Sequence, residues 1–506
     1  MSTRWLEKEG FGYTGPFWFA ILALVIMVSL GSTVWAAPED PPDPPPVVVD
    51  EPPDTPVSED PEATAEEVTP EEAAAEEPQN PPLTLDQTDA AEPVDYDGET
   101  PAPAERNYAK GSAKEKWDIF VDAWRGLSTW DLFDDRVTLR VYARVQVDGS
   151  VANGDSALEA EVGELRDSVK VRRFTVLADG TIDNHFRYVF GYEFGEDSGI
   201  WDAYVEGIDS GLTVFGYNVG DFRVGSFQEP FSLERVSGSY YGGFLERSLP
   251  VQTFSPARNI GYMVHRSVAK ERMSWAVGFF SFGSQNEENA SSSTLSVTGR
   301  ITGLPVWQDE GRHLVHVGIA FSSRNPQHSE TRYFSRPEAR FVEIVADTGD
   351  IEASAIKLFG AEAAMVQGPL WLQSEVIYSS VASSDYGNLG FWGGYVQAGY
   401  FLTGEVRPYN RAEGKFDRVY PRGEYEGGVP LRRSNGGAFE VVGRISNLDL
   451  NDEGVEGGKV LDFSAGLNWY ANATSKVMLN YIWSRVDGVG NANILLLRYQ
   501  YRPLPR

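Results

Sequence analysis

From Arg136 onward, large apolar residues occupy every second position over many short stretches of the chain. In 137–145, valine, leucine and alanine alternate with Thr138, Arg140, Tyr142 and Arg144. A period of two predicts a β-strand with one apolar and one polar face. The same alternation recurs in the segments 186–194, 295–301, 461–469 and 495–501. We interpret the apolar face as facing lipid and the polar face as facing water.

Sixteen such segments can be counted, and an even number is typical of closed bacterial barrels. Short connections, such as VQGP and ANATS, fall where periplasmic turns are expected, and longer ones, such as 281–293, 322–353 and 379–390, fall where outer loops are expected. A soluble two-sheet sandwich would also alternate in polarity, but it would not need this rhythm of connections. The predicted strands begin near Val137, Lys170, His185, Ile200, Asp221, Ile260, Met273, Thr294, His313, Ser354, Leu370, Phe391, Ala438, Val460, Lys476 and Asn493. The sequence therefore predicts an all-β fold over 136–506, a sixteen-stranded antiparallel transmembrane β-barrel.

The first 36 residues are typical of an export signal. Arg4 and Lys8 precede the apolar run 17–30, and Val34 and Ala36 have the spacing of a cleavage site. We predict a signal peptide over 1–36, cleaved after Ala36. An uncleaved inner-membrane anchor is the alternative.

Residues 37–105 are acidic and rich in proline. They hold 22 Asp and Glu and no Lys or Arg, so they carry most of the net charge of −31. Such a segment buries little and repels itself, which predicts a disordered linker, placed in the periplasm as a spacer or a cell-wall contact. The following segment, 106–135, has Trp117, Phe120 and Trp124 at the spacing of a short amphipathic helix.

The segment 222–261 begins as a strand and continues as a long loop. It contains four arginines, no lysine, and interleaved aromatic residues such as Phe231, Tyr240, Phe244 and Phe254. A solvated loop rarely carries so many large apolar side chains. We therefore predict a constriction loop that folds into the barrel, with its aromatics anchored on the wall and its guanidinium groups facing water.

Three parts of this segment, FQEPFSLE, FLERSLP and SPARNIG, resemble the phosphate-selective porin O and P family. LWLQSEVIY, GLNWYANATSKVMLNY and the closing LRYQY extend the resemblance over 136–501. The resemblance implies an outer-membrane barrel, usually a homotrimer, whose pore is narrowed by the loop after the fifth strand. The chain departs from the family at Gln228, where lysine is expected, and in ending YRPLPR, five residues past Tyr501. The second departure is expected to bear on assembly.

Anion passage needs basic groups spaced along a wet path, and the guanidinium fork matches phosphate oxygens. Each wall arginine could instead pair with an inward carboxylate, such as Asp202, Glu206, Glu193 or Glu440. In the loop, Glu234 and Glu246 could pair with the adjacent arginines and anchor the loop. The candidates are Arg235, Arg247 and Arg258 in the loop, and Arg140, Arg144, Arg187, Arg300, Arg444 and Arg498 on the wall.

Strand parity places the segment 402–422, which holds five basic residues, at the periplasmic end. It could fold inward as an anion exit, or form a salt-bridged connection without a transport role.

Catalysis is not expected, because the chain has five His, no Cys and no G-x-S-x-G elbow. No cofactor, metal or nucleic acid partner is expected. The predicted function is an outer-membrane porin that passes small anions by passive diffusion, with phosphate and polyphosphate as candidate solutes. The alternatives are a general diffusion porin and a structural envelope protein anchored by its barrel.

Overall fold

The computed structural model describes residues 129–133, 136–196, 198–208, 210–283, 293–326, 329–423 and 436–503. The predicted signal peptide, the linker and most of the predicted helical segment lie outside these residues. The last part of that segment, Thr129–Leu132, is strand β1, so the prediction of a helix is wrong there. Its backbone pairs with the first residues of β2, from Val137 to Arg140.

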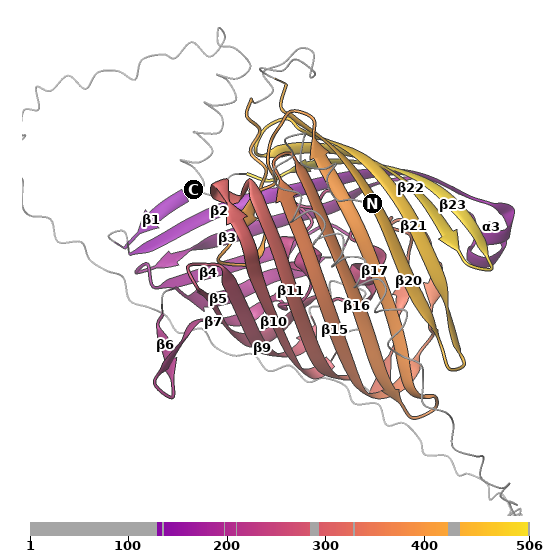
Figure 1. Cartoon of the computed structure of the whole chain (residues 1–506), viewed down its shortest axis with the longest axis horizontal. Helices are drawn as coiled ribbons and strands as arrows, with labels where there is room; N and C mark the ends of the chain where they lie inside the picture. The colour runs from indigo at the N-terminus through magenta and orange to yellow at the C-terminus, as the bar shows by residue number, and fades with distance from the viewer. Residues whose placement is uncertain are drawn as a thin grey trace, which may run out of the picture. The chain divides into compact units, whose positions relative to one another are not determined.

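Sixteen antiparallel strands form the barrel wall (Figure 1). The last strand pairs with the first, Val145 standing opposite Tyr501, and this pairing closes the barrel. The predicted fold and strand number are confirmed. The wall strands are β2 (Val137–Gly154), β3 (Ser168–Ile182), β4 (Phe186–Glu193), β5 (Gly199–Gly207), β7 (Tyr217–Gln228), β8 (Arg258–Val268), β9 (Met273–Gly283), β10 (Ser293–Gln308), β11 (His313–Pro326), β15 (Ile351–Gln367), β16 (Leu370–Ser383), β17 (Gly387–Phe401), β20 (Ala438–Asp452), β21 (Val455–Tyr470), β22 (Ser475–Val486) and β23 (Gly490–Tyr501).

The remaining elements are short. None of the described helices is long and apolar enough to cross a membrane. They are α3 (Ser156–Val162), α4 (Leu233–Ser237), α5 (Leu249–Phe254) and the 3-10 helix η1 (Asp309–Gly311). The short strands, besides β1, are β6 (Leu212–Val214), β12 (Glu330–Thr331), β13 (Phe334–Ser335), β14 (Ala346–Asp347), β18 (Tyr409–Asn410) and β19 (Lys415–Phe416).

Tight turns join many of the strands. Between β3 and β4, Asp183 and Asn184 both have positive φ, which Asp and Asn tolerate and which suits the twist of a hairpin. The connection expected over 379–390 is wrong, because β16 and β17 pair up to a turn at 384–386. We call the end at which β2 begins and β23 ends the periplasmic end, following the predicted orientation.

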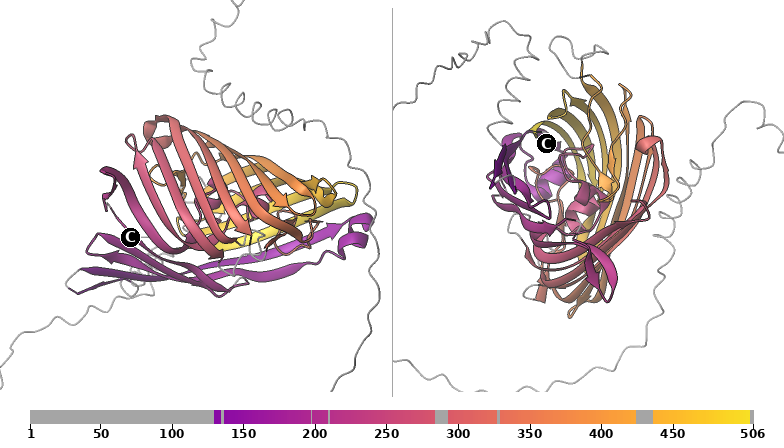
Figure 2. Two further views of the ribbon diagram at one scale, coloured as in Figure 1. Left: turned by 90° about the horizontal axis from the view of Figure 1, so that it is seen from below. Right: turned by 90° about the vertical axis from the view of Figure 1, so that its left-hand side faces the viewer.

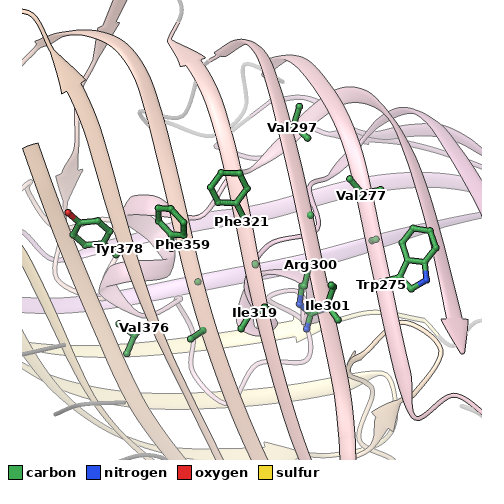
Figure 3. A pocket seen from close by; sticks show the side chains of 15 residues that line it. Trp275, Val277, Val297, Arg300, Ile301, Ile319, Phe321, Phe359, Val376 and Tyr378 are labelled. Carbon is green, nitrogen blue, oxygen red and sulfur yellow. The ribbon is translucent and has the colours of Figure 1, made fainter. Parts of the chain in front are cut away.

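The two faces of the wall differ as the alternation predicts. On β23, Leu495, Leu497 and Tyr499 are exposed on the outside, whereas Arg498 and Gln500 are buried inside. An apolar groove of about 890 Å³ lies on the outer face of β9, β10, β11, β15 and β16 (Figure 3). Its exposed lining residues, such as Phe321 and Phe359, suit contact with lipid acyl chains.

Three segments fill much of the barrel interior, seen from one end in Figure 2. The first is the loop 229–257 with α4 and α5, which confirms the predicted inward fold. The second, 329–350, was expected outside the barrel, yet Glu338 accepts hydrogen bonds from the inward-facing Arg444 and Ser464. The third, 402–423, enters from the periplasmic end, where the Phe416 N–H donates to Ser237 of α4.

Candidate functional site

The constriction loop (229–257) crosses the lumen and attaches to the far wall. The N–H groups of Leu233 and Glu234 donate to the Glu375 carboxylate of β16 over 3.0 and 2.7 Å. The Leu245 N–H donates to Asn480 Oδ1 of β22 over 2.9 Å. These bonds hold the loop against β16–β22 and leave open space on the side of β2–β5.

Carboxylates of the loop reinforce this attachment by pairing with wall arginines. Glu246 Oε1 lies 3.2 Å from Arg172 Nε of β3 and 2.7 Å from Arg498 Nη2 of β23. Glu234 Oε1 lies 3.1 Å from Arg444 Nη1 of β20. Burial raises the pKa of Glu246, but the attraction of Arg172 and Arg498 outweighs it and holds the pKa below the usual value. Glu246 is therefore an ionised anchor.

The remaining space is a cavity of about 310 Å³. One side is the wall of β2–β5, and the other is the constriction loop, the periplasmic segment 402–423 and the end of the chain. Its lining residues are Arg140, Tyr142, Arg144, Leu177, Asp179, Arg187, Val189, Trp201, Asp202, Tyr204, Val236, Ser237, Gly238, Ser239, Tyr240, Tyr241, Arg247, Arg258, Asn410, Glu413, Lys415, Asp417, Arg502 and Pro503.

Five of the seven principal candidate arginines, far apart in the chain, meet at this cavity. They are Arg140 and Arg144 of β2, Arg187 of β4, Arg247 of the constriction loop and Arg258 at the start of β8. The sequence therefore identified most of the charged wall of this space.

The other two principal candidates, Arg235 and Arg300, do not line the cavity. Arg235 is buried and donates from Nη2 to the Ser255 carbonyl, which ties together two parts of the constriction loop. Arg300 is 2.6 Å from Glu362 and also donates to the Gly414 carbonyl. Arg300 thus fastens the periplasmic segment to the wall, a structural role that its strand position alone could not reveal.

Several arginines of the cavity form ion pairs with carboxylates, which is the alternative to ion binding that the sequence left open. Arg140 Nη2 lies 2.5 Å from Asp179 Oδ2, and Arg258 Nε lies 3.1 Å from Asp202 Oδ1. The Arg258 guanidinium also stacks over Trp201, 3.8 Å from the ring centre. These pairs reduce the net charge of the cavity without removing guanidinium groups from its surface.

A comparison with known protein families supports the resemblance seen in the sequence. A family model described as "Phosphate-selective porin O and P" matches residues 139–502, from β2 to just beyond β23. This chain belongs to that family. The resemblance seen in the sequence is confirmed, and the protein is an outer-membrane porin.

Individual relatives of this porin are distant. Porin O of Pseudomonas aeruginosa is 24% identical over 412 residues, covering 74% of this chain and 89% of that protein. An uncharacterized protein of Caulobacter vibrioides is 26% identical over 401 residues, covering 75% of this chain and 76% of that one. The solved anion-selective porin from Comamonas acidovorans has a TM-score of 0.42 and 12% identity, covering 72% of this chain and 99% of its own.

Among the basic residues of the porin's cavity, sequence reasoning missed Arg502. This residue lies beyond the last strand and was treated as part of a tail that bears on assembly. A signal was nevertheless present in the sequence. Residue 502 has the same inward parity as Arg498 and Gln500, so continuing the alternation by one step would have predicted its direction.

Proposed function

We propose that this porin passes small anions by passive diffusion through the cavity between the constriction loop and β2–β5. Phosphate and polyphosphate are the candidate solutes, in keeping with the family's description. The observation that carries the proposal is the charge of the lining, where seven basic residues outnumber four acidic ones. A narrow wet path between low-dielectric walls concentrates the field of such an excess.

The acidic balance of the whole chain does not oppose this function. Most of the net charge of −31 belongs to residues 37–105, which precede the barrel. Exposed charges farther away than the Debye length, about 8 Å at physiological salt, are largely screened. The guanidinium groups at the cavity surface therefore act on a passing ion more strongly than any carboxylate that lies beyond this distance.

General diffusion without anion preference is the second candidate. The pairs Arg140–Asp179 and Arg258–Asp202 favour it, because each presents both signs of charge to the same cavity. The two candidates differ in the reversal potential of the current.

Replacement of Arg247 and Arg258 by alanine tests the proposal. In a planar bilayer under a salt gradient, the wild type should prefer chloride, and phosphate should block the chloride current. The double variant should lower the anion-to-cation permeability ratio about fivefold, because a unit charge at about 4 Å contributes about 1 kcal/mol even in water.

The matched control for this experiment is Arg485→Ala. Arg485 is exposed, lies outside the cavity and pairs with Asp487 over 3.5 Å, so its loss should leave selectivity unchanged. An unselective wild type, or an assembled double variant that keeps wild-type selectivity, would favour general diffusion.

We further propose that the porin is a homotrimer and that the acidic linker lies in the periplasm. The family supports the trimer. The even number of strands supports the linker's placement, because it brings both ends of the wall to the same side. An unheated sample that migrates as a monomer in detergent gels would contradict the trimer.

A further inference from the structure

The chain continues past its last strand into the cavity. Along β23, Tyr499 faces outward and Gln500 inward. Tyr501 stands opposite Val145 of β2 in an antiparallel register. One further step brings Arg502 level with Arg144, and both residues have inward parity. The two guanidinium groups therefore belong to adjacent positions of the wall, on the two strands whose pairing closes the barrel.

Hydrogen bonds hold the tail in this position. The Arg502 N–H donates to the Thr474 carbonyl over 2.8 Å. Arg418, which is buried, donates to the carbonyls of Arg502 and Pro503 over 2.8 and 3.0 Å, and to the Ala473 carbonyl over 2.7 Å. Arg418 is thus a positioning residue for the tail. Its hydrogen bonds hold the backbone that carries the Arg502 side chain.

Aromatic rings support both guanidinium groups. Arg502 lies over Tyr241 and Tyr240, with 4.4 and 5.6 Å to the ring centres. Arg144 lies over Tyr142 and Tyr240, at 5.4 and 5.7 Å, and donates to the Tyr142 hydroxyl over 3.0 Å. Tyr240 of the constriction loop therefore touches both arginines and sets them on a common aromatic surface.

Within the part of the chain that the structure describes, no carboxylate forms an ion pair with Arg144 or Arg502. This distinguishes them from Arg140 and Arg258 of the same cavity, each of which has an aspartate partner. Burial and the neighbouring Arg144 lower the pKa of Arg502. Both groups nevertheless stay charged at neutral pH, because a guanidinium is not deprotonated in that range.

Two like charges held side by side repel each other, and stacking on tyrosine offsets only part of this cost. An oxyanion placed between them would remove the repulsion and accept hydrogen bonds from both forks. We propose that Arg144 and Arg502 form an oxyanion-binding subsite of the cavity, where β2 meets the end of β23. Its ligand is phosphate or another tetrahedral oxyanion with several free oxygens. This inference rests on the proposed anion passage and names a residue pair that would retain the anion.

Phosphate titration of the single-channel chloride current tests the subsite in the full-length porin. Arg502→Ala should raise the phosphate concentration for half-block about tenfold, the change that one charge-assisted bond of about 1.4 kcal/mol corresponds to. Arg502→Lys should give a smaller rise, because lysine keeps the charge but loses the fork. Arg136→Ala is the matched control and should leave the block unchanged, since Arg136 lies at the periplasmic end outside the cavity and pairs with Asp183.

The outcomes separate the two proposals. A wild type without anion preference or phosphate block would contradict the proposed function itself. A wild type with both properties, together with an assembled Arg502→Ala porin that keeps the same half-block concentration, would overturn only the subsite. An Arg502→Lys porin with the full wild-type block would also overturn it, because charge alone would then explain the effect.

Discussion

Arginine residues have three roles in this porin, and their partners decide which one each has. Buried arginines such as Arg324, 2.9 Å from Glu229, belong to internal ion pairs that hold loops to the wall. Cavity arginines such as Arg140 pair with a carboxylate but remain at the surface of the path. Arg144 and Arg502 rest on tyrosines. Because only the second and third groups line the cavity, strand parity alone overestimates the number of arginines at its surface.

At this scale, Glu246→Gln should loosen the constriction loop. Glutamine keeps the size of the side chain but removes the charge that pairs with Arg172 and Arg498. Breaking a buried pair by removing one partner costs about 3 kcal/mol or more. We expect a noisier open-channel current in the variant at neutral pH. Glu453→Gln, in the turn between β20 and β21, is the matched control, and equal noise in both variants would contradict the anchoring role.

The pH dependence of the wild type follows from the same carboxylate. The pKa of Glu246 is lower in the folded porin than its ordinary value of about 4.3. Its contribution to stability is therefore fully present above that value and is lost as the pH falls through the lowered pKa. The wild-type current should stay quiet from pH 7 to about pH 5. Noise that rises already in this range would show that Glu246 does not carry the anchoring.

At the scale of elements, the strands were largely predictable, because the two-residue period and the turn residues are local features of the chain. Val137, Met273, His313, Leu370 and Ala438 are both predicted and observed first residues of strands. Loop placement was less predictable, since it depends on partners far away in the sequence. The aromatic content of 229–257 signalled an inward fold, whereas in 329–350 the deciding residue, Glu338, bonds to Arg444 more than a hundred residues later.

The same reasoning explains why two of the candidate arginines, Arg235 and Arg300, do not line the cavity. Arg300 has inward parity, as predicted, but 402–423 folds over it, and its Gly414 carbonyl accepts from Arg300. No pattern within β10 carries that information. Arg235 of α4 likewise donates to the carbonyl of Ser255, the C-cap residue of α5, and this contact depends on how the whole loop folds.

Arg300→Ala therefore has a different predicted outcome from the cavity variants. It should leave the reversal potential unchanged, because Arg300 does not line the cavity. It should lower the temperature at which the folded band disappears on a gel, because Glu362 loses a buried partner at a cost of on the order of 3 kcal/mol. A variant with wild-type thermal stability and reduced anion preference would return Arg300 to the ion path.

At the scale of the whole molecule, backbone pairing between the wall strands is what closes the described barrel. Every wall strand pairs with two neighbours, and the pairing of β2 with β23 leaves no open edge between them. In a membrane this closure satisfies the backbone hydrogen bonds of the wall. Nothing in that network requires residues 37–105, which have no apolar face to contribute to a core.

Deletion of 37–105, with the export signal kept, should therefore leave assembly and selectivity intact. The expected result is a heat-modifiable, detergent-stable oligomer with the wild-type reversal potential at physiological salt. The deletion removes 22 carboxylates, so a matched control that replaces them by Asn and Gln separates the effect of charge from that of length.

At salt of about 0.01 M the Debye length grows to about 30 Å, so carboxylates farther from the pore are screened much less. At this low salt, the deletion variant and the Asn/Gln variant should both show a somewhat higher anion preference than the wild type. Loss of the oligomer in the deletion alone would show that the linker's length is needed for assembly, whereas a changed selectivity at physiological salt in both variants would place the linker's charge close to the ion path.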